Sequence, residues 1–108
     1  MHKDISFWIP HNKIIEHETD KGEKIKKWLD ENDFFELARE CIGDWIKQIE
    51  LLDEFFHNQK QMTSKMYRIT YSPIDSSLTD PAKFTEKCNI LQDNFRNEIK
   101  NKLNVTLR

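Results

Sequence analysis

The residues of this sequence whose types suggest chemistry are aromatic and basic side chains in segments of alternating pattern. Trp8 lies in one such segment and Arg68 in another. An exposed indole can stack on a nucleobase, and a guanidinium can bind phosphate, a combination found in sheet-based RNA-binding proteins. Other basic residues are further candidates for phosphate binding. The candidate RNA-binding residues are Trp8, Lys60, Lys65, Arg68, Arg96 and Lys100.

Three of these candidates also have a purely structural interpretation. Asp4 could pair with Arg68 or Lys65 across neighbouring strands. The basic side chain would then serve the fold and would not bind phosphate. Trp8 could equally pack against another domain of a larger protein.

The sequence contains no constellation typical of a catalytic site. It has only two glycines, too few for a glycine-rich phosphate loop. The four histidines lie in termini and loops; His11 and His17 could bind a metal with a neighbouring glutamate, but exposed loop histidines are far commoner. We therefore expect no catalytic residue, no metal site and no cofactor in this chain.

Length and composition predict one soluble domain. The chain has 108 residues, and no apolar run approaches the roughly 20 residues of a membrane-spanning helix, so we expect no membrane partner. Cys41 and Cys88 lack the spacing of a metal or redox motif, which predicts buried free thiols.

Charge is distributed unevenly although the net charge is only −2. Residues 30–56 hold nine acids and two bases, whereas residues 57–72 hold three bases and no acid. Residues 21–27 and 95–108 are also basic. These acidic and basic segments could fold so that one basic face is presented to phosphate, or the charges could be scattered over the solvated surface.

The pattern along the chain predicts four strands and two helices. Strands are expected at 4–9, 46–56, 65–71 and 105–107, because these segments alternate or are rich in β-formers. A helix is expected to begin at Asp33, where Glu36 could complete a capping box, and to run to Trp45. Asp80 and Pro81 predict the start of a second helix, which continues to about residue 103. Residues 11–31 are interpreted as a charged insertion with one or two helical turns near Trp28.

This order is the βαββαβ pattern of a ferredoxin-like α+β fold, a four-stranded antiparallel sheet with two helices on one face. Alternation divides the strand residues between the two faces of the sheet. In 46–56 it groups Leu51 with Phe55, and elsewhere it turns Trp8 and Arg68 away from the helices. The side chains expected to face the helices are Ile5, Phe7, Ile9, Tyr67, Ile69 and Tyr71.

Six ordered segments resemble the ferredoxin-fold anticodon-binding domain of phenylalanyl-tRNA synthetases, especially the single-chain organellar type. The segments are 3–10, 32–37 with the later Gly43, 49–55, 63–71, 75–80 and 103–108; the fourth, TSKMYRITY, is the strongest. Residues 11–31 fall outside the match. One departure is Ser76, which stands where the family usually carries an arginine, so a contact made by that arginine is absent.

The resemblance implies that residues 1–108 form a single anticodon-binding domain, the C-terminal part of a longer synthetase. Its partners would be the anticodon stem-loop of tRNA(Phe) and the enzyme's catalytic domain. That domain would use ATP and Mg²⁺ and is absent from this chain. The resemblance also implies a mitochondrial or other organellar matrix location, with the cytoplasm as the alternative.

Two other classes of function fit the residues. The acidic segment 30–56 and Trp8 would suit a protein–protein docking module. A small-molecule-sensing domain of this fold would usually dimerise, whereas we expect a monomer.

Overall fold

The structure is a computed structural model that describes residues 1–74 and 80–108. The loop that contains Ser76 lies outside the described residues. The elements in chain order are β1 (His2–Pro10), η1 (His11–Lys13), β2 (Ile14–Glu18), β3 (Lys24–Trp28), α1 (Glu31–Cys41), η2 (Gly43–Trp45), β4 (Ile46–His57), β5 (Met62–Tyr71), α2 (Pro81–Lys102) and β6 (Thr106–Leu107).

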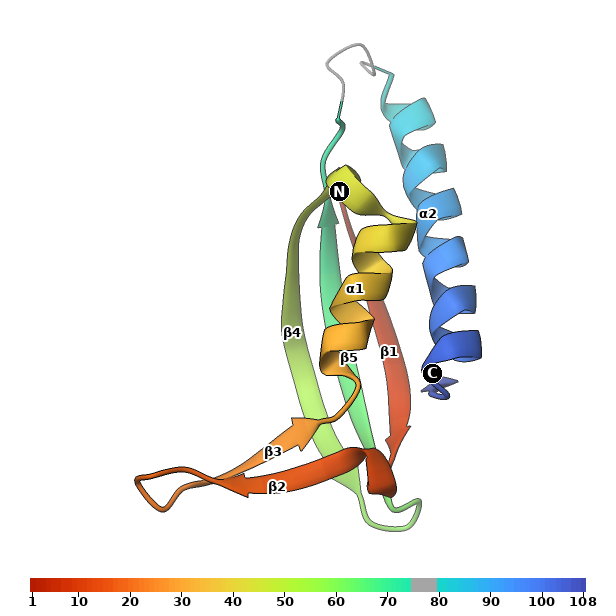
Figure 1. The fold of residues 1–108 in the computed structure, drawn as a ribbon. Helices are drawn as coiled ribbons and strands as arrows, with labels where there is room; N and C mark the ends of the chain where they lie inside the picture. The colour runs from red at the N-terminus through yellow and green to blue at the C-terminus, as the bar shows by residue number, and fades with distance from the viewer. Residues whose placement is uncertain (75–79) are drawn as a thin grey trace.

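The main sheet has four strands in the order β4-β5-β1-β6, and its paired strands are antiparallel. Both helices cover the same face of this sheet, and the opposite face is left open (Figure 1). The ferredoxin-like fold predicted from the sequence is therefore confirmed. None of the described helices combines the length and apolar character needed to span a bilayer.

The core lies between the sheet and the two helices. Ile5, Phe7 and Ile9 of β1 are fully buried, and Tyr67, Ile69 and Tyr71 of β5 are at most 2% exposed. The predicted division of β1 and β5 between a helix face and an open face is thus confirmed. Phe34 of α1 packs its ring 4.5 Å from that of Tyr67, measured between centroids.

The prediction of helical turns within residues 11–31 is wrong, because this segment forms the β2–β3 hairpin. Glu16 lies opposite Lys26 in its register, and Gly22 adopts a positive φ of 79° in the turn. Glu18 likewise lies opposite Lys24, and such cross-strand pairs of opposite charge suit a hairpin. Trp28 anchors the hairpin, since it is 1% exposed and its ring centroid lies 5.3 Å from that of Phe7. The rest of the hairpin projects from the end of the sheet (Figure 1).

The first helix begins and ends earlier than the sequence predicted. It starts at Glu31, after Asp30, whose carbonyl accepts the first helical hydrogen bond from the Phe34 amide at 2.9 Å. It ends at Cys41 because Gly43 adopts a φ of 65°, which breaks the helix. The second helix starts as predicted, with the Asp80 side chain accepting a hydrogen bond from the Ala82 amide at 2.9 Å.

An extra residue in β4 changes which of its side chains face the helices and which face the open side, compared with the prediction. Leu51 lies opposite Tyr67 and Asp53 lies opposite Met66, so Leu52 is unmatched and forms a bulge. The bulge reverses which face each later side chain takes. Leu51 therefore lies on the helix side and Phe55 on the open side, and the predicted grouping of these two residues is wrong.

Candidate nucleic-acid interface

A cluster of aromatic and cationic side chains occupies the open face of the sheet near the β4–β5 turn. Strands β1 and β4, the β4–β5 turn and the residue after β6 supply its members. Trp8 of β1 and Phe55 of β4 both lie opposite Ser64 of β5, so all three share one face. We call this cluster the Trp8 patch; its members are Trp8, Phe55, His57, Lys60 and Arg108.

The aromatic rings of the patch meet edge to face. The Trp8 ring lies 5.8 Å from that of Phe55 and 5.7 Å from that of His57, both measured between centroids. Trp8 itself is half-buried, and Phe55 is 39% exposed. Edge-to-face contacts are a favoured arrangement of aromatic rings and fix these rings in place.

Two cations lie against the indole. Lys60 Nζ is 4.5 Å from the centroid of the Trp8 ring, and Arg108 Cζ is 5.0 Å from it. Both distances are within the range of a cation–π interaction. Arg108 Nη1 also donates a hydrogen bond of 2.8 Å to Ser64 Oγ. Its backbone amide donates to the Ser6 carbonyl at 2.9 Å, which holds the residue beside β1.

The turn between β4 and β5 positions Lys60. Its backbone amide donates a hydrogen bond of 3.3 Å to Nδ1 of His57. Gln61 follows with a positive φ of 52°, and its side-chain amide donates to the Asn58 carbonyl at 2.6 Å. These contacts close the turn and direct the Lys60 side chain back across the open face to Trp8.

Arg68 lies on the open face as predicted, but it is paired with Asp4. Nε of Arg68 donates to Oδ1 of Asp4 at 2.8 Å, and Nη2 donates to Oδ2 at 3.2 Å. The alternative that these two residues pair is therefore confirmed. The hydrogen bond from Arg68 holds the pKa of Asp4 below its usual value. Glu50 also lies opposite Arg68, on β4. Because both carboxylates are close to its guanidinium, Arg68 leaves no free positive charge on this part of the open face.

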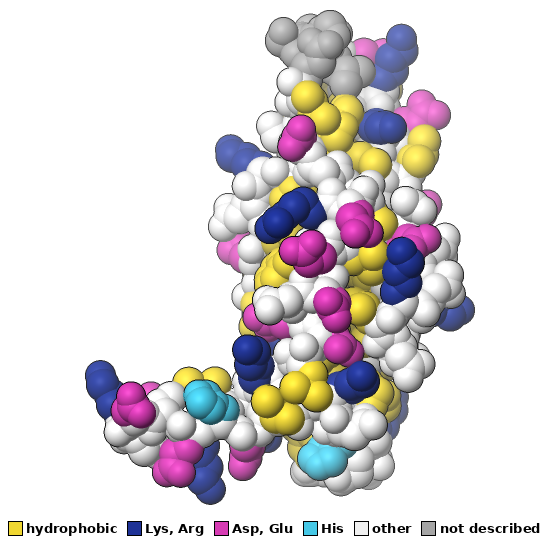
Figure 2. Space-filling view, viewed as in Figure 1, with side chains coloured by type: hydrophobic (Ala, Val, Ile, Leu, Met, Phe, Trp, Pro, Cys, Tyr) yellow, Lys and Arg dark blue, Asp and Glu magenta, His cyan; other side chains and the backbone are white. Residues whose placement is uncertain are grey.

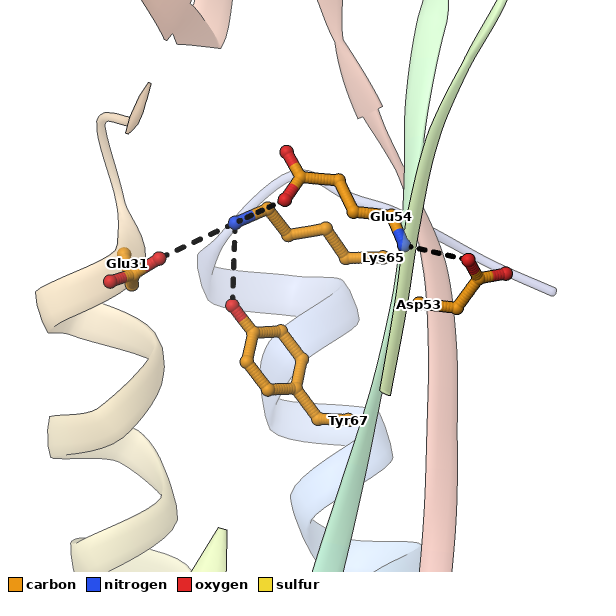
Figure 3. Close-up of polar contacts among 5 residues, drawn as sticks. All are labelled: Glu31, Asp53, Glu54, Lys65 and Tyr67. Atoms are coloured by element: carbon orange, nitrogen blue, oxygen red, sulfur yellow. Dashed lines mark hydrogen bonds and ion pairs between the residues drawn. The ribbon is translucent and has the colours of Figure 1, made fainter. Parts of the chain in front are cut away.

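Lys65, another predicted phosphate partner, is not available on the open face. It lies opposite Phe7, on the helix side, and is 4% exposed. Its Nζ lies 3.3 Å from a carboxylate oxygen of Glu31 and 3.9 Å from one of Glu54 (Figure 3). It also donates to the hydroxyl of Tyr67 at 3.5 Å. Burial, with Glu31 and Glu54 nearby, raises the pKa of Tyr67 and keeps it a neutral phenol.

Arg96 and Lys100 do not join the Trp8 patch. Both lie on α2, which covers the other face of the sheet (Figure 1). On that side acidic and basic side chains are interspersed rather than separated, as Figure 2 shows. The structure therefore brings together Trp8 and Lys60 of the predicted residues and leaves Arg96 and Lys100 in a different layer.

Phe55, His57 and Arg108 are members of the patch that the sequence did not single out. The bulge at Leu52, which leaves no mark in residue type, places Phe55 and His57 on the open face. Arg108 follows the short final strand, whose pairing with Phe7 and Trp8 could have indicated its position.

Other polar groups in the described residues offer little chemistry. No group of three or more His, Cys, Asp or Glu gathers in the described ranges as metal ligands would. Cys88 is buried and Cys41 is half-buried, and both are free. Burial raises the pKa of both thiols, which disfavours the reactive thiolate.

Comparison with known proteins gives relatives that match nearly the whole chain, although no protein-family model matches it. The chloroplastic/mitochondrial phenylalanine–tRNA ligase of Arabidopsis thaliana is 36% identical over 107 residues, which cover 99% of this chain and 20% of that protein. The mitochondrial enzyme of Dictyostelium discoideum is 36% identical over 98% of this chain and 19% of its own length. Human ferredoxin-fold anticodon-binding domain-containing protein 1 is 33% identical over 97% of this chain and 14% of its own length.

These relatives confirm the resemblance that the sequence indicated. The chain spans about a fifth of the length of the two ligases. The matched segment is thus a small domain of a larger enzyme in those proteins.

Proposed function

We propose that this chain, a homologue of one domain of the organellar phenylalanine–tRNA ligases, binds the anticodon stem-loop of tRNA(Phe) through the Trp8 patch. The observation that carries the proposal is the contact of the Trp8 ring with two cations. Lys60 Nζ and Arg108 Cζ lie 4.5 and 5.0 Å from its ring, and Phe55 extends the aromatic surface.

The patch combines the two features that single-stranded RNA requires. Unstacked loop bases can stack on aromatic side chains, a contact worth about 1–3 kcal/mol per base. The neighbouring Lys60 and Arg108 can neutralise the phosphates on either side of such a base. An anticodon loop offers these unpaired bases, and the human relative is named for an anticodon-binding domain.

The wider assignment follows from the ligase relatives. We propose that the chain acts with a catalytic domain that activates phenylalanine with ATP and Mg²⁺, and that it positions tRNA(Phe) for aminoacylation. This domain would itself be non-catalytic, without a cofactor, and monomeric. The names of the relatives support an organellar location, mitochondrial or plastid, over the cytoplasmic alternative.

The test is a fluorescence-anisotropy titration of the 108-residue chain with a labelled tRNA(Phe) anticodon stem-loop and a scrambled-loop control. Trp8→Ala should weaken binding about tenfold, and Trp8→Phe should recover part of the loss because it keeps a stacking surface. Lys100→Ala is the matched control, since it removes a basic side chain from α2, on the other side of the sheet. Circular dichroism would show that each variant is folded.

A docking module would give a different result. The affinity of such a module for the stem-loops would not depend on loop sequence. It would also not fall steeply with salt, because no counterions are released from phosphate. Equal binding of the native and scrambled loops, or no binding at low salt, would reject the anticodon assignment.

A further inference from the structure

The outermost strand of the main sheet, β4, is hydrogen-bonded to a neighbour on one side only. It is the edge strand in the order β4-β5-β1-β6, and within residues 1–74 and 80–108 no strand pairs with its outer side. Figure 1 shows β4 along one margin of the sheet. β4 has 12 residues, whereas β6 at the opposite edge has two. β4 is therefore the long free edge of the sheet, and its outward N–H and C=O groups can accept a further strand.

The helix side of this edge exposes apolar surface. Leu51 lies on that side and is 45% exposed, and Leu52, in the bulge, is 39% exposed. Ile49 is half-buried on the same side as Leu51. Together with Phe35 of α1 it helps to line a hollow of about 270 Å³ between the helix and the strand. The helix layer therefore leaves the outer margin of β4 uncovered, and apolar side chains of an added strand could pack there.

The open side of the same edge is acidic. Glu50 and Asp53 lie on that side, and both are exposed. Asp53 forms no salt bridge within the described part of the chain, and its Oδ1 accepts a hydrogen bond of 3.0 Å from the Glu54 amide. In Figure 3 its carboxylate points away from the Lys65 cluster, on the other side of the strand. This carboxylate is thus free to meet a cation from outside the fold.

These two sides define the chemistry of a strand that would fit the edge. Successive side chains of a strand point to opposite faces of its sheet. One set would lie beside Ile49 and Leu51 and should be apolar, and the other would lie beside Glu50 and Asp53 and should be basic. Cross-strand pairs of opposite charge are stabilising. Arg68 is the one cation beside Glu50 on β5 and is already hydrogen-bonded to Asp4, so an excess of negative charge remains.

We propose that the β4 edge binds an extended segment of another protein, in which basic and apolar residues alternate, as a fifth strand of the sheet. The segment would lie beside residues 48–53, ahead of Phe55 and the Trp8 patch. The inference goes beyond the proposed function and does not depend on RNA binding, because an edge that carries Glu50 and Asp53 would repel phosphate.

The charges also disfavour a second copy of the chain on this edge. β4 holds three acids and one lysine. An antiparallel pair of β4 strands centred on Leu52 would place Glu50 of one copy beside Glu54 of the other, and like charges across strands are destabilising. Charged side chains and bulges are the usual protection of a free edge against pairing with its own copies. Here they leave a basic strand as the partner that fits.

The test is an NMR titration of the ¹⁵N-labelled 108-residue chain with a capped heptapeptide of alternating lysine and valine. The amide signals of residues 48–54 should shift, and their hydrogen exchange should slow. Glu50→Gln/Asp53→Asn should weaken binding about fivefold. Glu86→Gln/Asp93→Asn is the matched control, because it removes the same charge from exposed positions on α2 and should keep the affinity.

Backbone methylation of the peptide separates strand addition from simple charge attraction. Successive N–H groups of an extended strand point to opposite sides, so only every second one can donate to β4. Two peptides would be N-methylated on alternate residues, one in each phase. One phase should weaken binding about tenfold or more, and the other should leave it unchanged.

Three results would overturn the inference. Equal affinity of the two methylated peptides would show attraction by charge without strand pairing. Unchanged β4 signals would place the peptide elsewhere or show that it does not bind. Protection of the β4 amides that rises with protein concentration, without peptide, would assign the edge to a second copy. None of these results bears on the binding of the anticodon stem-loop, which is measured separately.

Discussion

Trp8 and Phe55 lie opposite the same residue, Ser64, from the two strands that flank β5. Their rings meet edge to face beside it, with centroids 5.8 Å apart. This contact depends on the bulge at Leu52, because without the extra residue Phe55 would point to the helix side with Leu51. The aromatic surface is therefore a product of how three strands pair, and small changes of register would remove it.

Lys60 should contribute to RNA binding mainly through charge. If it contacts one phosphate, Lys60→Ala should reduce the slope of log affinity against log salt by about 0.7–0.9. Lys100→Ala, on α2, should leave the slope unchanged. The measurement is an anisotropy titration at four or more salt concentrations, roughly from 50 to 200 mM. Equal slopes for the Lys60→Ala variant and the wild type would place the RNA away from the Trp8 patch.

The sequence predicted β1 and β5 well because both alternate without interruption. It could not predict the face of Phe55, since a bulge adds a residue without requiring any particular residue type at Leu52. The hairpin was misread because Trp28 and its apolar neighbours also fit a short amphipathic helix. The burial of Trp28 against Phe7 determines that this segment forms a hairpin. A local sequence pattern carries no information about such a tertiary contact.

The candidate site was predictable only in part, for a related reason. The alternation that turns Tyr67 toward the helices also turns Lys65 there, so its positive charge was a poor guide to its partner. Lys60, in contrast, lies in a turn that is free to fold back over Trp8. Charge counts along the chain locate basic segments but do not show which layer of the fold they occupy, as Arg96 and Lys100 on α2 illustrate.

Asp4 should weaken RNA binding, because its negative charge lies on the same face as the RNA site. It occupies Arg68 in a two-point hydrogen-bonded pair on the open face. Asp4→Asn removes one negative charge from this face and leaves the guanidinium free to attract phosphate. We expect the affinity for the stem-loop to rise about two- to fivefold at low salt and the gain to shrink as salt increases.

The double variant Asp4→Asn/Arg68→Ala is the control for this prediction. It should lose most of the gain, because the freed guanidinium is no longer present. An unchanged affinity in the single variant would show that the RNA does not extend along β5 as far as Arg68.

Lys65 should support stability rather than RNA binding. Lys65→Met keeps an unbranched side chain of similar length, and Glu31 and Glu54, whose side chains are 39% and 34% exposed, can regain water. We expect the free energy of unfolding to fall by about 1–2 kcal/mol, less than the loss for a pair whose partner stays buried. Lys65→Ala should cost about 2–4 kcal/mol because it also leaves a cavity.

Urea unfolding would measure these stabilities, and anisotropy would measure RNA affinity in the same variants. The affinity of folded Lys65→Met should stay within about twofold of the wild type, in contrast to Lys60→Ala. A loss of affinity as large as that of Lys60→Ala would mean that Lys65 reaches the RNA after all.

Tyr71 should make the fold sensitive to alkaline pH. Its hydroxyl donates a hydrogen bond of 2.5 Å to Oε1 of Gln92, and both side chains are buried. Burial raises the pKa of Tyr71 above its ordinary value of 10, so the folded state keeps a proton that the unfolded chain releases. Stability is therefore fully present below about pH 10 and falls as pH rises beyond it, by about 1.4 kcal/mol per pH unit for this one group.

Tyr71→Phe should remove this dependence while lowering stability at neutral pH. Loss of the hydroxyl leaves Oε1 of Gln92 buried without its donor, which costs about 1–3 kcal/mol at pH 7. Above pH 10, however, the variant should lose stability less steeply than the wild type, so the two urea-unfolding curves should converge. Taking the difference between the two proteins at each pH cancels the titration of groups that they share, including Tyr67. Parallel pH profiles would show that Tyr71 ionises as readily in the folded state as in the unfolded chain.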